Sequence, residues 1–212
     1  MKITKFGHCC LLIEEGGLRI LTDPGYYSEG QNKVENIDIV LITHEHQDHL
    51  HVDSLKKILE NNPVAKVFTN KGVGKFLDGQ NISYSLLENG QTITEQGIEI
   101  EGFGEKHELM YSGLPQVDNV GYMVDGKFFY PGDAFTNPNK KVDLLALPVS
   151  APWLKIGEVI DYAKLLKPNV CFPVHDASST NPLTAYRPCS TILEPLGIKF
   201  IPLEIEKPTD FE

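Results

Sequence analysis

The sequence predicts an α/β (α+β) fold in which two β-sheets carry their helices on the outer faces. Two stretches, residues 1–40 and 82–130, have the turn spacing of β-hairpins, and each is followed by strand–helix units. Hairpins build antiparallel strands, whereas strand–helix units add strands with a helix against one face, so this order predicts two helix-covered sheets. No repeat, low-complexity run or linker interrupts the sequence, and we expect one domain over residues 1–212.

Local patterns in the first half predict four strands and two helices. Gly16-Gly17 is typical of a hairpin turn, and residues 39–42 form an unbroken apolar run, as in a strand buried on both faces. Apolar residues at helical spacing follow Asp53 and Ser54, either of which is a suitable helix cap. The expected strands are 10–13, 19–22, 39–42 and 67–69, and the expected helices begin near 53 and 72.

The second half continues with strands and ends with a helix between strands. Asp125-Gly126, between two apolar runs, is the strongest hairpin signal in the chain. Apolar residues recur at helical spacing over 156–166, and this helix should end before Pro168. The expected strands lie within 82–103 and at 122–124, 128–130, 144–149, 170–172 and 200–203.

Composition excludes several classes of protein. Of the 212 residues, 41% are hydrophobic and 23% charged, and 19 basic against 29 acidic residues give a net charge of −10. An acidic surface repels phosphate backbones, so we expect a small-molecule substrate and no nucleic acid. The longest apolar stretch, 144–154, contains two prolines and is shorter than the ~18 residues of a membrane span. With no targeting segment and no disulfide pattern among the four cysteines, we expect a cytoplasmic protein without membrane insertion; nothing in the sequence indicates an oligomeric state.

The stretch from Thr43 to His51 carries the chemistry, because four of the seven histidines fall within eight of its residues. It begins where a buried strand ends. His44 and His46 are two residues apart, so in an extended segment they point to the same side. Asp48 and His49 follow where the chain turns into a helix, and they can serve a neighbouring position. A zincin site is excluded, because the residue four positions after His44 is an aspartate.

Further ligands are expected at other strand ends, since two metal ions need more than this loop supplies. His107, Asp133 and His175 each follow an apolar strand, and Gly132 permits the tight turn before Asp133. A solvated histidine-rich loop is the alternative, but crowded imidazoles repel one another when protonated, so such a loop gains nothing without a metal.

The ordered pattern His44-x-His46-x-Asp48-His49, a single histidine, Gly132-Asp133 and a last histidine resembles the metallo-β-lactamase-fold hydrolase superfamily over nearly the whole chain. Gly7-His8 and Thr22-Asp23-Pro24 are similar to its small single-domain branch, which includes ascorbate-6-phosphate lactonase-like and N-acylphosphatidylethanolamine phospholipase D-like proteins. The resemblance implies a four-layer αβ/βα sandwich with the metals at the sheet edges. It also implies one metal on His44, His46 and His107, a second on Asp48, His49 and His175, and Asp133 as the bridge.

This resemblance implies a dinuclear hydrolase in which a metal-bridging hydroxide attacks a small ester, lactone, amide or phosphoester. Asp48 and Asp133 would be the catalytic carboxylates, with Asp48 orienting the hydroxide or relaying a proton. A ligand set without thiolate suits two Zn²⁺ ions, and Mn²⁺ or Fe²⁺ also fits it. The bridging Asp133 argues against penicillin hydrolysis, and Ala134 stands where many relatives have a threonine.

Substrate contacts are expected from side chains near the ligands: His8, Tyr111, Phe135 and Trp153. His8 either faces the metals or is a hydrogen-bonded structural histidine. His51 is expected to lie behind the ligands or to cap a helix, and Arg187 either binds an anionic group or is a plain surface arginine.

Two other classes of function stay open. A redox enzyme on the same scaffold is one; the flavodiiron type is disfavoured because it has a carboxylate where this chain has His46, whereas the mono-iron persulfide dioxygenase type uses the first site alone. The other is a non-catalytic metal- or ligand-binding module. The number of metal ions per chain distinguishes the mono-iron type from a dinuclear hydrolase.

Overall fold

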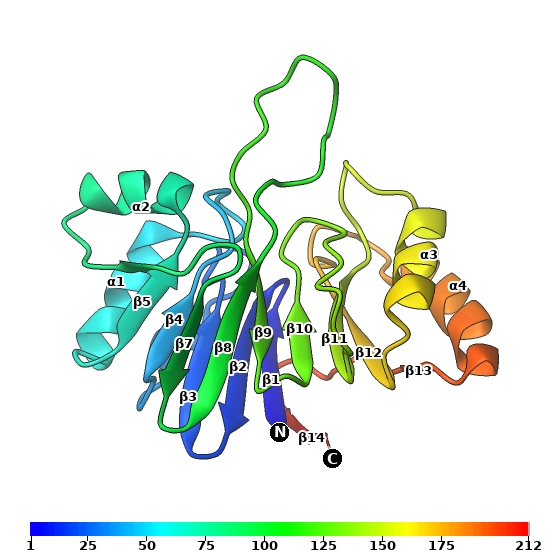
Figure 1. Ribbon diagram of the computed structural model, residues 1–212, viewed down its shortest axis with the longest axis horizontal. Coiled ribbons are helices and arrows are strands. Elements are labelled where there is room, and N and C mark those ends of the chain that lie inside the picture. The colour runs from blue at the N-terminus through cyan, green and yellow to red at the C-terminus, as the bar shows by residue number, and fades with distance from the viewer. Residues whose placement is uncertain (212) are drawn as a thin grey trace.

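The computed structural model describes residues 1–211, and its two sheets face each other across a shared apolar core (Figure 1). Over these residues the first sheet has seven strands, in the order β14 (Pro208–Asp210), β1 (Lys2–Gly7), β2 (Cys10–Glu15), β3 (Leu18–Thr22), β4 (Ile39–Leu41), β5 (Lys66–Thr69) and β6 (Ser85–Leu86). Strands β1 to β3 are joined as antiparallel hairpins, and β3 to β6 are parallel neighbours.

The second sheet repeats this plan. Within residues 1–211 it also has seven strands, in the order β13 (Lys199–Phe200), β12 (Val170–Val174), β11 (Leu144–Pro148), β10 (Phe128–Tyr130), β9 (Gly121–Val124), β8 (Ile98–Phe103) and β7 (Thr92–Glu95). Strands β7 to β10 are antiparallel and β10 to β13 are parallel. The predicted order of hairpins followed by strand–helix units is therefore confirmed in both sheets.

Helices cover the outer face of each sheet. Figure 1 shows α1 (Val52–Asn61) and α2 (Lys71–Asp78) beside the first sheet, and α3 (Ile156–Leu166) and α4 (Leu183–Leu193) beside the second. Short 3-10 helices lie at Gly30–Lys33 and Glu194–Leu196. One apolar cluster lies between the sheets, and two more lie under the two helix pairs. The four-layer αβ/βα sandwich is confirmed. The single domain expected over residues 1–212 stays a prediction, and its last residue lies outside the described ones.

Three local predictions need correction. His51, not Asp53 or Ser54, occupies the N-cap position of α1, and its Nδ1 lies 2.9 Å from Ser54 Oγ. Helix α4 was not predicted, because Pro188 inside it is a residue that normally interrupts a helix. The strand expected at 200–203 is shorter and ends at Phe200, before Pro202, which lacks the N–H that a strand pairing needs. No helix among the described residues is long and apolar enough to cross a membrane.

Candidate metal centre

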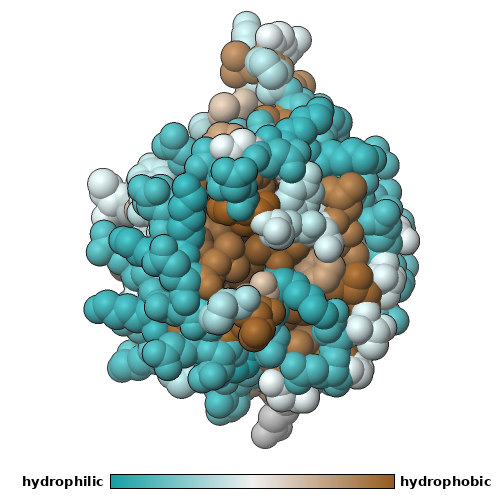
Figure 2. Space-filling model, turned by 90° about the vertical axis from the view of Figure 1, so that its left-hand side faces the viewer, coloured by the Kyte–Doolittle hydropathy of each residue, from teal (hydrophilic) through white to brown (hydrophobic). Residues whose placement is uncertain are grey.

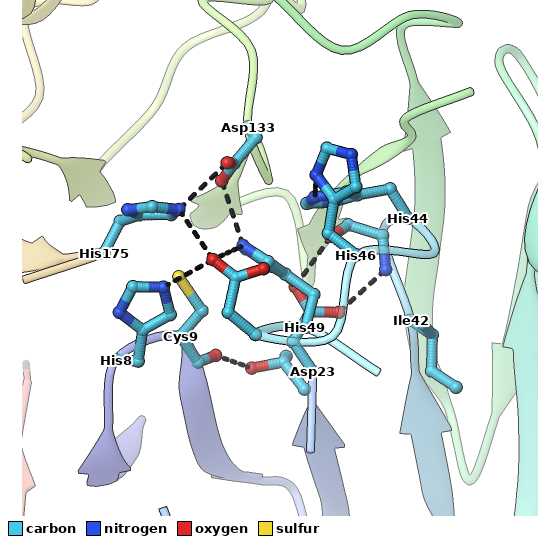
Figure 3. A network of polar contacts seen from close by, with 12 residues as sticks. His8, Cys9, Asp23, Ile42, His44, His46, His49, Asp133 and His175 are labelled. Carbon is cyan, nitrogen blue, oxygen red and sulfur yellow. Dashed lines mark hydrogen bonds and ion pairs between the residues drawn. The ribbon is translucent and has the colours of Figure 1, made fainter. Parts of the chain in front are cut away.

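The seven predicted ligands meet at one edge of the two sheets (Figure 3). The loop that follows β4 contributes four of them, and the other three follow β8, β10 and β12 of the second sheet. They are His44, His46, Asp48, His49, His107, Asp133 and His175. Parallel strands bring their carboxyl ends to the same edge, which is why residues far apart in the chain come together.

The first cluster consists of His44, His46 and His107, whose ligand atoms lie within 4.8 Å of one another. His44 Nδ1 lies 3.0 Å from Thr43 Oγ1, and that hydroxyl donates to Asp23 Oδ2 at 2.6 Å, so the imidazole must donate to it. Nε2 of His44 is then free of a proton and lies 3.1 Å from His46 Nδ1. Nitrogens on one tetrahedral Zn²⁺ stand ~3.3 Å apart, given bonds of ~2.0–2.1 Å. One cation fits this pair.

The second cluster consists of Asp48, His49 and His175, and a nitrogen of His8 belongs to the same group, in which all ligand atoms lie within 4.8 Å of one another. Asp48 Oδ2 is 3.4 Å from His175 Nε2 and 3.9 Å from His49 Nε2. Its side chain is 23% exposed, whereas those of His49 and His175 are almost fully buried. Asp48 is therefore the member of this cluster that a substrate can approach.

Asp133 lies between the two clusters. Its Oδ2 is 3.3 Å from His107 Nε2 and 2.9 Å from His175 Nε2, and its Oδ1 is 3.2 Å from His49 Nε2. Gly132, with φ +65°, makes the turn, and a Cβ there would meet Thr43 Cβ at 2.8 Å. The carboxylate is thus placed where it can reach an ion on either side.

Hydrogen bonds on the far side of three further imidazoles fix their orientation. His49 Nδ1 lies 2.7 Å from Asp23 Oδ2, His107 Nδ1 lies 2.6 Å from the Glu108 carbonyl, and His175 Nδ1 lies 2.6 Å from the Ser150 carbonyl. Each Nδ1–H donates outward, so each Nε2 points inward. Such outer partners both orient ligand histidines and raise their basicity.

Asp23, which was not predicted as a site residue, supports the loop that carries the candidate ligands. It is fully buried, and its Oδ1 accepts from the Thr43 backbone N–H at 2.8 Å. Oδ2 accepts from the Thr43 hydroxyl, from His49 and from the Tyr130 hydroxyl. The signal that could have identified it is the one that identified Asp133, a carboxylate directly after an apolar strand.

Buried polar atoms test whether metal ions fit this centre. Among the described residues, the buried atoms without a hydrogen-bond partner include His49 Nε2, His175 Nε2 and Asp133 Oδ1. His49 Nε2 and Asp133 Oδ1 are close, but their geometry is not that of a hydrogen bond. Buried unpaired polar groups cost about 1–3 kcal/mol each, and a cation among them would remove this cost. The donor set therefore fits divalent ions.

The electrostatics of the centre agree with that fit. Burial, the largest effect, lowers the pKa of His44 well below its usual value, so its imidazole is neutral. Burial opposes the charged form of Asp133, but the charges of His49 and His175 outweigh it and hold its pKa well below the usual value. Burial likewise opposes protonation of His175, yet Asp133 and Asp48 raise its pKa to about 9. The buried Asp133 and the partly exposed Asp48 thus hold positive charge nearby, and metal ions can supply it in place of protons.

His8 was expected to contact either the metals or the protein, and the structure favours the protein. The residue is 2% exposed, and its Nδ1 accepts from the Ala177 N–H at 3.3 Å. Its Nε2–H therefore donates to Asp48 Oδ2 at 3.2 Å. Burial, the largest effect, lowers the pKa of His8 to about 4, so the ring is neutral. It orients Asp48 and presents little surface to a substrate.

The other expected substrate contacts fall at different distances from the centre. Trp153 Nε1 donates to Asp133 Oδ2 at 3.0 Å, so this indole lies at the ligands. Phe135 packs behind it, with ring centroids 5.2 Å apart, while Tyr111 is 72% exposed on a protruding loop. Arg187 is exposed on α4.

Two facing sheets with outer helices and a cluster of histidines and carboxylates at their common edge define a protein of the metallo-β-lactamase fold. The family model described as "Beta-lactamase superfamily domain" matches residues 2–175, and the chain belongs to this superfamily.

Individual relatives agree with this assignment. Protein Rv0786c of Mycobacterium tuberculosis is 34% identical over 182 residues, which cover 84% of each chain. The UPF0173 metal-dependent hydrolase TV0864 of Thermoplasma volcanium is 27% identical over 192 residues, covering 82% of this chain and 83% of its own. The structure of Igni18, a metallo hydrolase of Ignicoccus hospitalis, superposes with a TM-score of 0.77 at 22% identity, covering 100% and 99% of the chains, and supports the fold.

Proposed function

We propose that the protein is a dinuclear metal-dependent hydrolase. The family match and the relatives described as metal-dependent hydrolases assign the chain to the metal-dependent hydrolases of the β-lactamase superfamily. The proposed ligands are His44, His46 and His107 for one ion and Asp48, His49 and His175 for the other, with Asp133 shared. The proposal of two ions rests on the position of the Asp133 carboxylate, which lies within 3.3 Å of imidazole nitrogens from both clusters.

Divalent ions at such a centre activate water at neutral pH and polarise a carbonyl or phosphoryl oxygen. The protein's own groups do the rest. Asp48 is held by the His8 N–H and is the more exposed of the two proposed catalytic carboxylates, so it is placed to orient the attacking water. The Trp153 N–H fixes the orientation of Asp133.

The proposal extends to the metal and the substrate. Nitrogen and carboxylate donors without thiolate suit Zn²⁺, and Mn²⁺ or Fe²⁺ also fits. The substrate is a small ester, lactone, amide or phosphoester, and the net charge of −10 argues against nucleic acid. The cytoplasmic location expected from the sequence stays a prediction.

Metal analysis of protein purified without chelator tests the proposal. We expect two transition-metal ions per chain, a lower melting temperature after their removal, and hydrolysis within a panel of esters, lactones and phosphodiesters. A stoichiometry that stays at one after reconstitution with Zn²⁺ or Mn²⁺ would contradict the dinuclear centre and favour the mono-iron alternative. Two bound ions with no hydrolysis across the panel would favour a binding module.

A further inference from the structure

The loop after His107 carries apolar side chains that the fold leaves in solvent. It connects β8 to β9 and stands above the rest of the molecule (Figures 1 and 2). Leu109, Met110, Tyr111 and Leu114 are 51%, 47%, 72% and 51% exposed. These four large apolar side chains fall within six positions of one loop, and exposed apolar side chains that gather in this way often mark binding sites.

The base of this loop is fixed to the candidate ligands. The His107 N–H donates to the Val117 carbonyl at 3.1 Å, and the Glu108 N–H donates to the Asp133 carbonyl at 2.8 Å. Below them, the Asn119 N–H donates to the Glu105 carbonyl at 3.1 Å. The apolar part of the loop is therefore held at a defined place beside the metal centre.

A cavity of about 240 Å³ lies between the loop and the first cluster. His46 and His107 belong to its lining, and the loop supplies the apolar walls: Leu109, Met110, Leu114, Pro115 and Val117. Pockets that enclose whole drug-sized ligands measure ~300–1,000 Å³, so this cavity is below that range and has room for an alkyl or aryl substituent.

The polar residues of the lining are turned toward the protein. Gln116 Nε2 donates to the His107 carbonyl at 2.6 Å, and Glu108 Oε1 accepts from the Phe135 N–H at 3.1 Å. Glu108 also gives the lining a negative charge, which disfavours an anionic group. Beside the two histidines, most of the accessible lining is hydrocarbon and the Met110 thioether, a flexible group that adapts to differently shaped apolar partners.

We propose that this cavity binds an uncharged apolar substituent of the substrate, an alkyl or aryl group, while the scissile bond lies at the metal centre. The inference rests on the proposed hydrolase function and narrows its substrate class. The occupant is a part of the substrate because two proposed metal ligands line the cavity, so a group bound there is within one small molecule's length of the reacting atoms.

Chain-length series test this subsite on the zinc-loaded protein. The substrates are 4-nitrophenyl acetate, butyrate and hexanoate, the corresponding alkyl 4-nitrophenyl phosphodiesters, and γ-lactones with side chains of increasing length. We expect kcat/KM to rise by up to about fourfold per methylene until the cavity is full. The double variant Leu109→Ser/Leu114→Ser should flatten this rise, so that kcat/KM falls most for the longest substrate of each series. Its melting temperature and metal content should match the wild type, because both side chains are half-exposed.

The matched control is Leu165→Ser/Leu196→Ser, which removes two leucines of similar exposure, 60% and 57%, from the outer layer over the second sheet. It should keep the wild-type chain-length dependence. A second measurement needs no turnover: the neutral fluorophore N-phenyl-1-naphthylamine should bind metal-free protein saturably, at least tenfold more weakly in the loop variant than in the control.

Each outcome decides between the two proposals. Turnover that is independent of chain length, or fluorophore binding that the loop variant does not weaken, overturns the subsite and leaves the hydrolase standing. No turnover of any series by protein that holds two ions contradicts the hydrolase, and the subsite falls with it.

Discussion

Asp23 and Leu109 both lie near candidate ligands and are held in the protein in opposite ways. Asp23 is fully buried and accepts hydrogen bonds from Thr43, His49 and Tyr130, whereas Leu109 is 51% exposed on a loop fixed at its base. The buried side sets the geometry of the ligands on strand ends, and the loop side presents surface that can change without moving them. On the proposed function, the strand ends hold the groups that carry the reaction, and the loop contributes to the choice of substrate.

The largest effect should come from Asp133, the carboxylate shared by both clusters. Asp133→Ala should lose at least one metal ion and lower hydrolytic activity at least ~100-fold, since losing a positioned ion removes several kcal/mol of transition-state stabilisation. Plasma mass spectrometry and initial rates measure both. Glu45→Gln is the control, because the Glu45 carboxylate faces Gly72 at the start of α2 and not the metal centre. The metal content of this variant should stay at two ions per chain. Its free energy of unfolding should fall by at most ~1 kcal/mol.

Asp133→Ala and Glu45→Gln together test the placement of the metal loop. If both variants lose the same activity and metal content, Glu45 takes part in the reaction. The expectation that Glu45 points away from the metal ligands of its loop would then be wrong.

The next effect concerns the support beneath His175. Lys5 Nζ, almost fully buried, donates to the Pro173 carbonyl at 2.8 Å and to Asp176 Oδ2 at 2.6 Å, which joins β1 to the segment around this ligand. Lys5→Met leaves Asp176 buried without its cation, so we expect a loss of about 3–5 kcal/mol in the free energy of unfolding. Denaturant unfolding measures it.

Lys127→Met is the matched control for Lys5→Met. Lys127 pairs with Glu15 and Asp125 on the surface, and its loss should cost at most about 1 kcal/mol. If the two variants lose the same stability, the buried pair does not support the His175 segment in the way that the structure indicates.

A smaller effect is expected from Asp23→Asn. The amide keeps the shape of the side chain but removes the negative charge of the carboxylate that accepts three side-chain hydrogen bonds. Because hydrogen-bond partners of metal ligands contribute about 10–100-fold to metal affinity, the affinity of this variant for metal should fall by about that factor. Competition with a chromophoric chelator gives the dissociation constants. Asp125→Asn, in the exposed turn before β10, should leave them unchanged; weakened binding in both variants would point to a general charge effect.

The smallest effect should separate the two hydrogen bonds of His8. His8→Gln offers an N–H at about the place of Nε2 and should keep Asp48 oriented, so the affinity of the second ion should fall only slightly. His8→Asn retains a polar group nearer the Ala177 N–H but does not reach Asp48, and this affinity should fall further. The opposite order would assign the role of His8 to the Ala177 side.

The sequence indicated which residues would meet where the local pattern of strands matched the folded structure. His44 to His49 are contiguous, and His107, Asp133 and His175 each follow an apolar strand, so strand ends alone indicated that they would meet. Helix α4 was missed because Pro188 is a local signal against a helix, which packing on the second sheet overrides.

The roles of Asp23 and His8 depend on contacts between distant segments. Asp23 precedes Pro24-Gly25 and fits a simple strand end, while its partner His49 is 26 residues away and is brought near by the parallel pairing of β3 with β4. His8 contacts Ala177 across 169 residues and between the two sheets. No local pattern encodes such contacts.

Positive backbone φ angles recur at this centre, at His8 (+48°), Asp23 (+35°) and His175 (+58°). This conformation costs a non-glycine residue roughly 1–3 kcal/mol and persists where surrounding contacts enforce it. Glycine at these positions would relieve the strain but remove the side chain on which the centre depends. Stability and catalysis therefore compete within the same three residues, and gains in thermal tolerance have to come from elsewhere in the chain.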